Sequence, residues 1–151
     1  MRLATAAATA AIMFVFAAPS HSAEIYKDYT PSKEVYDMIF VHVFPNRLDD
    51  YLDGMKQTWW SSWCQAEKKD GAAIDCQIYA STTMDNRDFN VVFITKRPSA
   101  AMSDPDEARY NAVMADTRKK LTEDKQKSLV AGYNEMRTIF GQQIFRQLTF
   151  K

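Results

Sequence analysis

Residues 35–44 (VYDMIFVHVF) give the strongest strand signal in the chain. β-Branched and aromatic residues fill this stretch almost without interruption, as is typical of a β-strand. Side chains alternate between the two faces of a strand. One face would carry Tyr36, Met38, Phe40, His42 and Phe44, and the other Asp37, Ile39, Val41 and Val43. Because both faces are mainly apolar, we expect both to be covered.

A helix is predicted over residues 47–68, after a turn at Pro45 and Asn46. Asn46 suits the N-cap position, and Asp49 and Asp50 suit the positive end of the helix dipole. Apolar or small residues recur every three or four positions, at Leu48, Leu52, Met55, Trp59, Ser62 and Ala66. This spacing indicates a helix that lays one face on a sheet, and Gly71 is expected to cap its end.

Two strands are predicted next, over residues 74–82 and 89–95, with the polar segment 84–88 between them. Alternation of apolar and polar residues and the short connection indicate a β-hairpin. A second helical region is expected to open at Asp104, as N-cap, and Pro105, in the first helical position. The charged segment 118–127 is interpreted as a solvated surface or a break, after which helix extends to Phe140. Gly141 would stop it, and residues 142–150 would form the last strand.

The predicted order of elements is β-α-β-β-α-β, an α+β fold with a four-stranded antiparallel sheet. Two helices can cover only one face of such a sheet. The first strand, however, is apolar on both faces, and Ile144 and Phe145 must point to opposite sides of the last strand. A second copy of the chain is the simplest partner for the uncovered face, so a homodimer is predicted.

Four segments carry a resemblance to a known superfamily: the first strand ending in Pro45, the helix opening NRLDDYLDGMKQTWW, the hairpin around Asn86, and the closing IFGQQIFRQLTFK. In layout they resemble the dimeric α+β barrel superfamily of ferredoxin-like domains. This superfamily includes the antibiotic-biosynthesis monooxygenase, EthD-like and stress-responsive barrel families. The resemblance implies a dimer that holds a small molecule between two sheets. It carries no catalytic signature, so any function drawn from it is an analogy.

The N-terminus has the features of a secretory signal peptide over residues 1–22. Arg2 precedes an uncharged, Ala-rich stretch, and Pro19 and small residues come before a cleavage point ahead of Ala23. A retained membrane anchor is the alternative, but the stretch is shorter than the roughly 20 residues that a spanning helix needs. We therefore expect an exported protein, periplasmic or secreted, with a lead-in arm at 23–34 and the barrel domain at 35–151.

The charge balance is close to neutral, with 19 basic and 19 acidic residues in the whole chain. Loss of Arg2 with the leader leaves 18 basic and 19 acidic residues, a net charge of −1. Such a protein has no electrostatic reason to bind nucleic acid.

Both cysteines, Cys64 and Cys76, follow the leader, and a pair in an exported protein is a disulfide candidate. Two separate buried thiols are the alternative, because Cys64 lies well round the helix from the apolar stripe. A bridge would need the helix end to fray or turn. The spacing of the two cysteines, without further Cys or His partners, predicts no metal site.

His42 is the candidate catalytic residue, because it is the only histidine after the leader and lies between Phe40 and Phe44 on one strand face. In an aromatic pocket it could transfer a proton or ligate iron, and a hydrogen-bonded histidine in a packed core is the alternative. The candidates for lining a ligand lumen are Phe40, His42, Phe44, Gln77, Tyr79, Trp59 and Trp63. No cofactor is predicted, since a haem role would need a cavity that admits a macrocycle and no haem-attachment motif is present.

The motifs of the large enzyme classes are absent: no nucleophile elbow, P-loop, dinucleotide fingerprint or zinc-protease motif occurs. The sequence predicts an exported α+β barrel that binds a small molecule of unknown identity, with oxygenase-like chemistry as one form that it could take. The alternative is a structural or protein-interaction domain with a packed dimer interface and no pocket.

Overall fold

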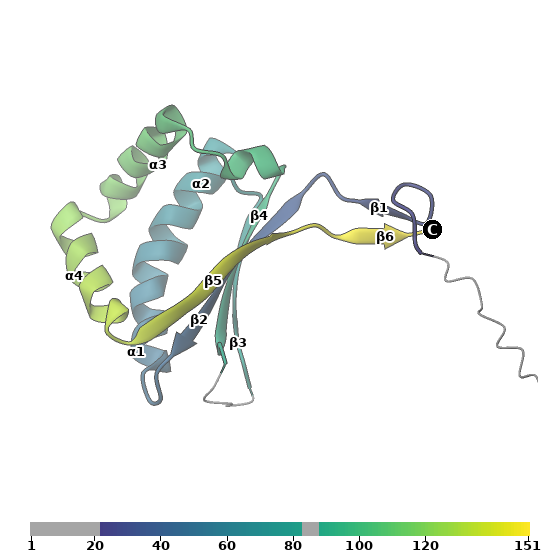
Figure 1. The fold of residues 1–151 in the computed structure, drawn as a ribbon. Coiled ribbons are helices and arrows are strands. Elements are labelled where there is room, and N and C mark those ends of the chain that lie inside the picture. Colours follow the sequence, from purple (N-terminus) through teal and green to yellow (C-terminus); the bar gives the residue numbers. More distant parts are fainter. Residues whose placement is uncertain (1–21, 83–87) are drawn as a thin grey trace, which may run out of the picture.

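The computed structural model describes residues 22–82 and 88–151 (Figure 1). The predicted signal peptide, apart from its last residue, and most of the predicted turn at 84–88 lie outside these ranges. Four strands form the main sheet: β2 (Val35–Val43), β3 (Asp75–Ala80), β4 (Val91–Arg97) and β5 (Arg137–Phe145). They pair in the order β3-β4-β2-β5, and every neighbouring pair is antiparallel.

The helices lie on one face of this sheet, so the predicted layering is confirmed (Figure 1). A long helix made of α1 (Leu48–Met55), η1 (Lys56–Cys64) and α2 (Gln65–Asp70) follows the first strand of the sheet. After the third strand come the short 3₁₀ helix η2 (Ala100–Ser103), then α3 (Glu107–Lys120) and α4 (Glu123–Asn134). The connectivity βαββαβ, with the first strand beside the fourth and the third, is the ferredoxin-like fold.

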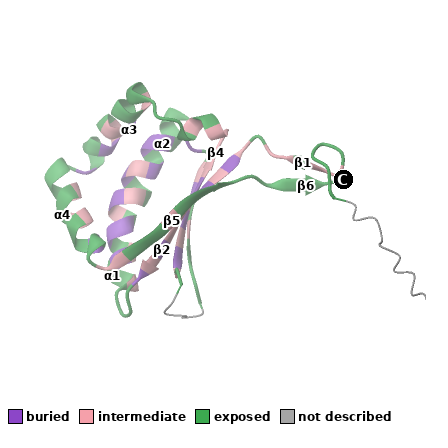
Figure 2. Ribbon diagram, in the orientation of Figure 1, coloured by how far each residue is buried: buried purple, intermediate pink, exposed green. Residues whose placement is uncertain are grey.

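The core lies between the helices and the sheet. Its buried cluster consists of Val41, Val43, Tyr51, Met55, Val91, Phe93 and Tyr133. The predicted alternation of β2 is observed, since Val35, Asp37, Val41 and Val43 are buried on the helix side. The side chains between them are only half-buried, because the described residues put no element over the other face (Figure 2).

The long helix differs from a regular α-helix at its centre, where η1 is π-helical over nine residues. Cys64 lies nine residues after Met55, which is two and a half turns of α-helix and therefore the opposite face. The wider π-helical turn brings Cys64 back to the sheet side, where it is buried and bonded to Cys76. The disulfide is thus confirmed, but the expectation that the helix end must fray or turn is wrong.

Two predicted helix starts need correction. Asn46 does not cap α1: the N-cap residue is Arg47, without a side-chain cap, and Asn46 has a positive φ of 62°. Asparagine is one of the few residues that tolerate this left-handed conformation. The cap of α3 is Asp106 and not Asp104, since its Oδ1 accepts a hydrogen bond from the Arg109 amide at 2.9 Å.

The end of the second helical region was also predicted wrongly. α4 ends at Asn134, and residues 137–145 pair with β2 as a strand that includes Ile139, Phe140 and Gly141. The register shifts beside Phe40, where β5 accommodates an extra residue as a bulge. Helical spacing of apolar residues was overridden here by pairing with a strand that lies about a hundred positions earlier.

The predicted last strand, residues 142–150, is divided in two. β5 ends at Phe145, and β6 (Leu148–Phe150) pairs with β1 (Tyr29–Pro31) in a separate two-stranded ribbon. This ribbon extends away from the main sheet and brings the two ends of the described chain together (Figure 1). Arg146 fixes the bend between the strands, because its Nη1 donates to the Ser32 carbonyl at 2.8 Å.

Candidate ligand-binding surfaces

The uncovered side of the main sheet, hereafter the open face, is built from regular cross-strand rows. The register places Gln77, Ile94, Met38 and Gln143 in one row, and Tyr79, Val92, Phe40 and Gly141 in the next. His42 pairs with Thr138 one step further along β2. Because residues two apart on a strand point to the same side, these rows form a single surface.

An aromatic cluster occupies the His42 end of the open face. Phe40 packs edge-on against Phe89 with ring centroids 4.8 Å apart, and its ring lies 6.4 Å from that of Phe145. The His42 ring is 6.0 Å from Phe44 and 6.3 Å from Phe140. Gly141 lies opposite Phe40 in the sheet register, and a β-carbon at this position would meet no atom within 4 Å. The open face is therefore not filled by protein atoms at this position of the protomer.

His42 is held in one orientation. Its Nδ1 lies 2.7 Å from the Asp88 carbonyl oxygen, which can only accept a hydrogen bond. Nδ1 therefore carries a proton, and the neutral ring leaves Nε2 as the atom that can accept a proton or a hydrogen bond. This arrangement suits a base, and it equally suits a structural histidine that closes the strand end.

Five of the seven predicted lumen residues share the open face or its edge: Phe40, His42, Phe44, Gln77 and Tyr79. Tyr79 donates a hydrogen bond to Gln77 at 2.8 Å, so the two side chains of β3 act as a pair. Phe89, Phe140 and Gly141 were not among the predicted residues, because two of them were assigned to the second helix and its end. Asn90, the polar residue beside β4, is structural, since it bonds both backbone groups of Val43.

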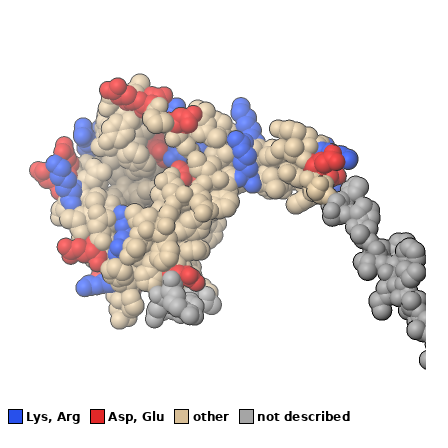
Figure 3. Space-filling model, viewed as in Figure 1, with Lys and Arg blue, Asp and Glu red and all other residues tan. Residues whose placement is uncertain are grey.

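The other two predicted residues, Trp59 and Trp63, belong to η1 and therefore lie on the helix side of the sheet, opposite the open face. Trp59 packs edge-on against Phe93 at 5.1 Å between ring centroids and joins the core cluster. Trp63 borders two cavities on this side, of about 580 Å³ and about 240 Å³. A hollow is visible between α3 and α4 on one side and β5 on the other, with charged side chains along its border (Figure 3).

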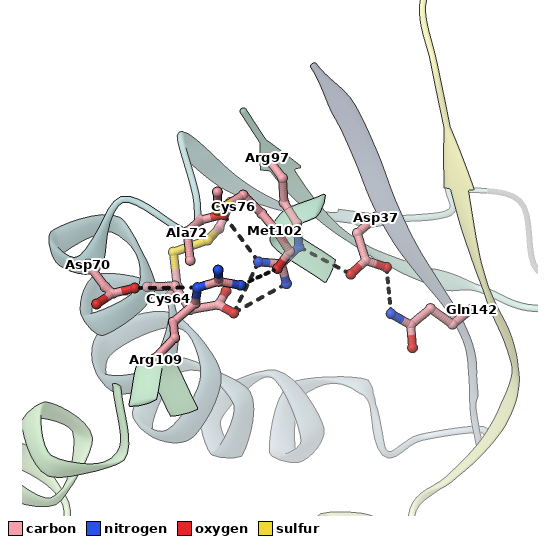
Figure 4. A network of polar contacts seen from close by, with 10 residues as sticks. Asp37, Cys64, Asp70, Ala72, Cys76, Arg97, Met102, Arg109 and Gln142 are labelled. Atoms are coloured by element: carbon pink, nitrogen blue, oxygen red, sulfur yellow. Dashed lines mark hydrogen bonds and ion pairs between the residues drawn. A yellow bond between two sulfur atoms is a disulfide. The ribbon is translucent and has the colours of Figure 1, made fainter. Parts of the chain in front are cut away.

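Buried charges form one wall of the larger cavity (Figure 4). Arg97 Nε lies 3.4 Å from Asp37 Oδ2, and its Nη1 and Nη2 each donate to Glu67 Oε1 at 3.2 Å. Gln142 donates to the other oxygen of Asp37 at 2.6 Å, and the Ala72 carbonyl accepts from Arg97 at 3.2 Å. All members are paired, which is the condition for burying such charges.

A second arginine, Arg109, closes the helical side of this cavity. It donates to the Met102 carbonyl at 3.1 Å and to Asp106 at 3.2 Å, and its Nε lies 3.9 Å from Asp70 (Figure 4). The contacts join α2, η2 and α3 above the sheet. Each of the two guanidinium groups already has carboxylate partners. We therefore interpret Arg97 and Arg109 as structural cross-links between elements and not as groups available to bind a ligand in the larger cavity.

Neither a protein-family model nor a curated protein sequence matches the chain. Solved structures of similar shape include a dimeric ferredoxin-like protein from an uncultured marine organism, with 16% identity, coverage of 80% of this chain and 96% of that one, and a TM-score of 0.43. A protein of unknown function from Bacteroides thetaiotaomicron, described as a possible oxidoreductase, has 13% identity, coverage of 76% and 98%, and the same TM-score of 0.43.

A candidate antibiotic biosynthesis monooxygenase from Bordetella bronchiseptica has 11% identity, coverage of 77% and 96%, and a TM-score of 0.42. At such low similarity no activity is transferred from these three structures, and the fold assignment rests on the strand order and connectivity of this chain. Within residues 22–82 and 88–151, no helix is both long and apolar enough to cross a membrane.

Proposed function

We propose that the protein is an exported homodimer that binds a small molecule between the open faces of two sheets. The observation that carries this proposal is the aromatic cluster of the open face. Phe44, Phe89, Phe140 and Phe145 are each at least 40% exposed around Phe40 and His42. A contiguous apolar surface of this kind on a folded domain marks an interaction site.

A second copy of the chain is the partner that best fits the open face. Among the described residues, the cross-strand rows of β5, β2 and β4 at the His42 end consist of aromatic, aliphatic and uncharged polar side chains, so this part of two open faces could pack without burying unpaired charge. At the other end of the open face, Lys96 and Asp75 already have partners, Glu34 and Lys68. A twofold-symmetric contact of like with like is also the commonest form of association for soluble proteins.

The missing side chain at Gly141 would leave room for a ligand between the two sheets. Gly141 lies opposite Phe40 in the sheet register, and Phe40 is two residues before His42 on the same face of β2. A pocket there would have aromatic walls and one group, His42 Nε2, that can take up a proton. Such a site suits an aromatic or otherwise apolar molecule with a single polar group. Proton abstraction, as in cofactor-free oxygenases, is one use of it, and binding without reaction is another.

Export is supported by the leader-like N-terminus and by the Cys64–Cys76 disulfide. Disulfides persist in oxidising compartments such as the bacterial periplasm and are rare in the cytosol.

Substitution of Phe140 tests the dimer. Phe140 is 55% exposed in the protomer, so Phe140→Asp should leave the fold intact and place two charges in the proposed interface. Light scattering should give a dimer mass for the native protein and a monomer mass for the variant. Tyr110→Asp, at a 56% exposed aromatic residue on α3, is the matched control and should remain dimeric. A native protein that is monomeric at micromolar concentration would contradict the proposal.

Gly141→Leu separates a ligand-filled lumen from a packed interface. A β-carbon at this position meets no atom of the protomer within 4 Å, so the main effect of the added side chain is expected between the two copies. If the space holds a ligand, native mass spectrometry of protein from its own source should show a dimer with an adduct, and the variant should keep the dimer mass and lose the adduct. If the interface is solidly packed, the native dimer carries no adduct and the variant dissociates.

A further inference from the structure

A second and smaller cavity lies on the helix side of the sheet, away from the open face. Its volume is about 240 Å³. Ile39, Phe93 and Ile139 of the sheet form its floor, and Trp59 and Trp63 of η1 form one wall. Arg137, the first residue of β5, lies at its edge. The lining is thus mainly apolar and aromatic, with Thr58 and Gln126 as uncharged polar members and Arg137 as its one charged residue. We refer to it as the Arg137 cavity.

The partners of Arg137 are all uncharged. Its Nη1 donates to the Tyr51 hydroxyl and its Nη2 to the Asn134 side-chain oxygen, each at 2.9 Å. The guanidinium also stacks over the ring of Tyr133, at 4.8 Å, and over that of Tyr51, at 5.7 Å. These contacts fix the guanidinium in place without neutralising it.

Arg137 differs in this respect from the other arginines of the hollow. Arg97 and Arg109 both have carboxylate partners, whereas no ion pair among the described residues includes Arg137. Arg146 also lacks a carboxylate partner, but it is exposed to solvent on the strand connection, while Arg137 is half-buried. A partly buried cation without a counter-ion is costly, and an anion that enters the cavity would remove this cost.

Tyr51 cannot supply the missing negative charge. Burial raises the pKa of its phenol above the usual value of 10.0, and this effect outweighs the opposing influence of the Arg137 hydrogen bond. Tyr51 is therefore a neutral hydrogen-bond acceptor at physiological pH. The N–H groups of Arg137 that do not bond Tyr51 or Asn134 remain to donate to a ligand, since a guanidinium has five.

We propose that the Arg137 cavity binds a small aromatic carboxylate, with the ring against the Trp59–Phe93 pair and the carboxylate on the guanidinium of Arg137. A planar guanidinium matches the two oxygens of a carboxylate. The apolar floor disfavours strongly hydrated dianions such as inorganic phosphate. The volume is just below the roughly 300 Å³ at which ligand pockets usually begin, so one or two fused rings are the size that fits.

This site is separate from the proposed dimer lumen, because the sheet lies between them. The two tryptophans that were expected beside His42 lie at this site instead. Trp59 and Trp63 both line the Arg137 cavity, so their fluorescence can report its occupation.

The test uses 2-naphthoate as probe, with 2-naphthalenemethanol as its neutral analogue and 2-naphthylmethylamine as its cationic analogue. Binding to the native protein is measured by calorimetry and by quenching of tryptophan fluorescence. Naphthoate should bind about ten- to a hundredfold more tightly than the alcohol, as expected for hydrogen bonds to a charged group. The amine should bind more weakly than the alcohol. Equal binding of naphthoate and the alcohol, or no saturable naphthoate binding up to millimolar concentration, would overturn the proposal.

Three variants locate the site. Arg137→Gln should abolish the preference for naphthoate over the alcohol, whereas Arg118→Gln, which removes a charge from an exposed ion pair with Glu123, should leave it unchanged. If Arg137→Gln fails to fold, Arg137→Lys serves instead and should keep a reduced preference. Gly141→Leu, on the open face, should bind naphthoate like the native protein. Loss of binding in Gly141→Leu together with native binding in either Arg137 variant would assign the probe to the open face and refute the Arg137 cavity.

Discussion

The two faces of the main sheet use alternate residues of the same strands, yet they differ in almost every physical property. On the helix side, Val41 is fully buried and Phe93 is 3% exposed. On the open face, Tyr79 of β3 and Phe140 of β5, at opposite edges of the sheet, are each 55% exposed. Both sets are apolar or aromatic, so residue type alone does not distinguish them. The difference arises because the helices of the chain are enough to cover one face only.

The simplest expectation is that charged side chains lie on the exposed face of a sheet and aromatic side chains on the covered face, and here part of the distribution is the reverse. The helix-covered side contains the buried Arg97, Asp37 and Glu67, whereas the His42 end of the open face is aromatic. Charge is tolerated inside because each group has a partner, and aromatic surface remains outside because nothing in the described chain covers it. The contrast shows that which side of a sheet is interior follows from the covering elements and not from the composition of a strand.

The largest expected effects come from substitutions on the helix-covered side. Phe93→Ala should lower the free energy of unfolding by about 3–5 kcal/mol, because it leaves a cavity beside Tyr51 and Trp59. Phe140→Ala is the same chemical change on the open face and should cost the monomer no more than about 0.5 kcal/mol. Urea unfolding of both variants, at low and high protein concentration, measures the difference.

The concentration dependence sharpens this comparison. If the open face is a dimer interface, Phe140→Ala should destabilise more at high protein concentration, where the native protein gains from association. Equal losses for the two variants at low concentration would show that the open face is covered within one protomer, contrary to the structure.

A comparable loss is expected when Arg97 is replaced by methionine. The change would leave Asp37 and Glu67 buried without a cation, at a cost of about 3–5 kcal/mol. The triple variant Arg97→Met, Asp37→Asn, Glu67→Gln should recover much of that loss, because no unpaired charge remains. Chemical denaturation of the two variants checks this expectation, and a triple variant no more stable than the single one would assign the loss to packing instead.

The disulfide should contribute somewhat less. Cys64 and Cys76 are 12 positions apart, and closing a loop of this size stabilises a fold by about 3 kcal/mol. Cys64→Ala combined with Cys76→Ala should lower the denaturation midpoint by a corresponding amount. Reductant should destabilise the native protein and leave the double variant unaffected, and an equal response of both would argue against a bridge in solution.

Much of the fold could be predicted from local patterns. The strand at 35–44, the hairpin strands and the sheet-facing stripe of the first helix were predicted within a few residues, because each has a clear period of its own. β5 was missed at its start, since Ile139 and Phe140 continue the spacing of α4 and only pairing with β2 makes them a strand. The π-helical turn that brings Cys64 to Cys76 likewise has no signature in the local sequence.

The residues of the candidate sites likewise fall into those that the local sequence pattern could place and those that it could not. His42 and its neighbours could be placed on one strand face because strand alternation is strict. The tryptophans were expected on that surface as well, but a helix lies on the opposite side of the sheet from the open face, and Trp59 and Trp63 follow it there. Arg137 was not singled out, because an arginine without an acidic partner can be recognised only when all its neighbours are known.

By itself the sequence determined which residues alternate on each strand, which face of the first helix is apolar, and that a pair of cysteines was available. These properties depend on neighbours a few positions away. Tertiary structure alone decided which sheet face is covered, where Cys64 points, and that Arg137 keeps an uncompensated charge beside an apolar cavity. Each of these depends on contacts between segments far apart in the chain, which local periodicity does not encode.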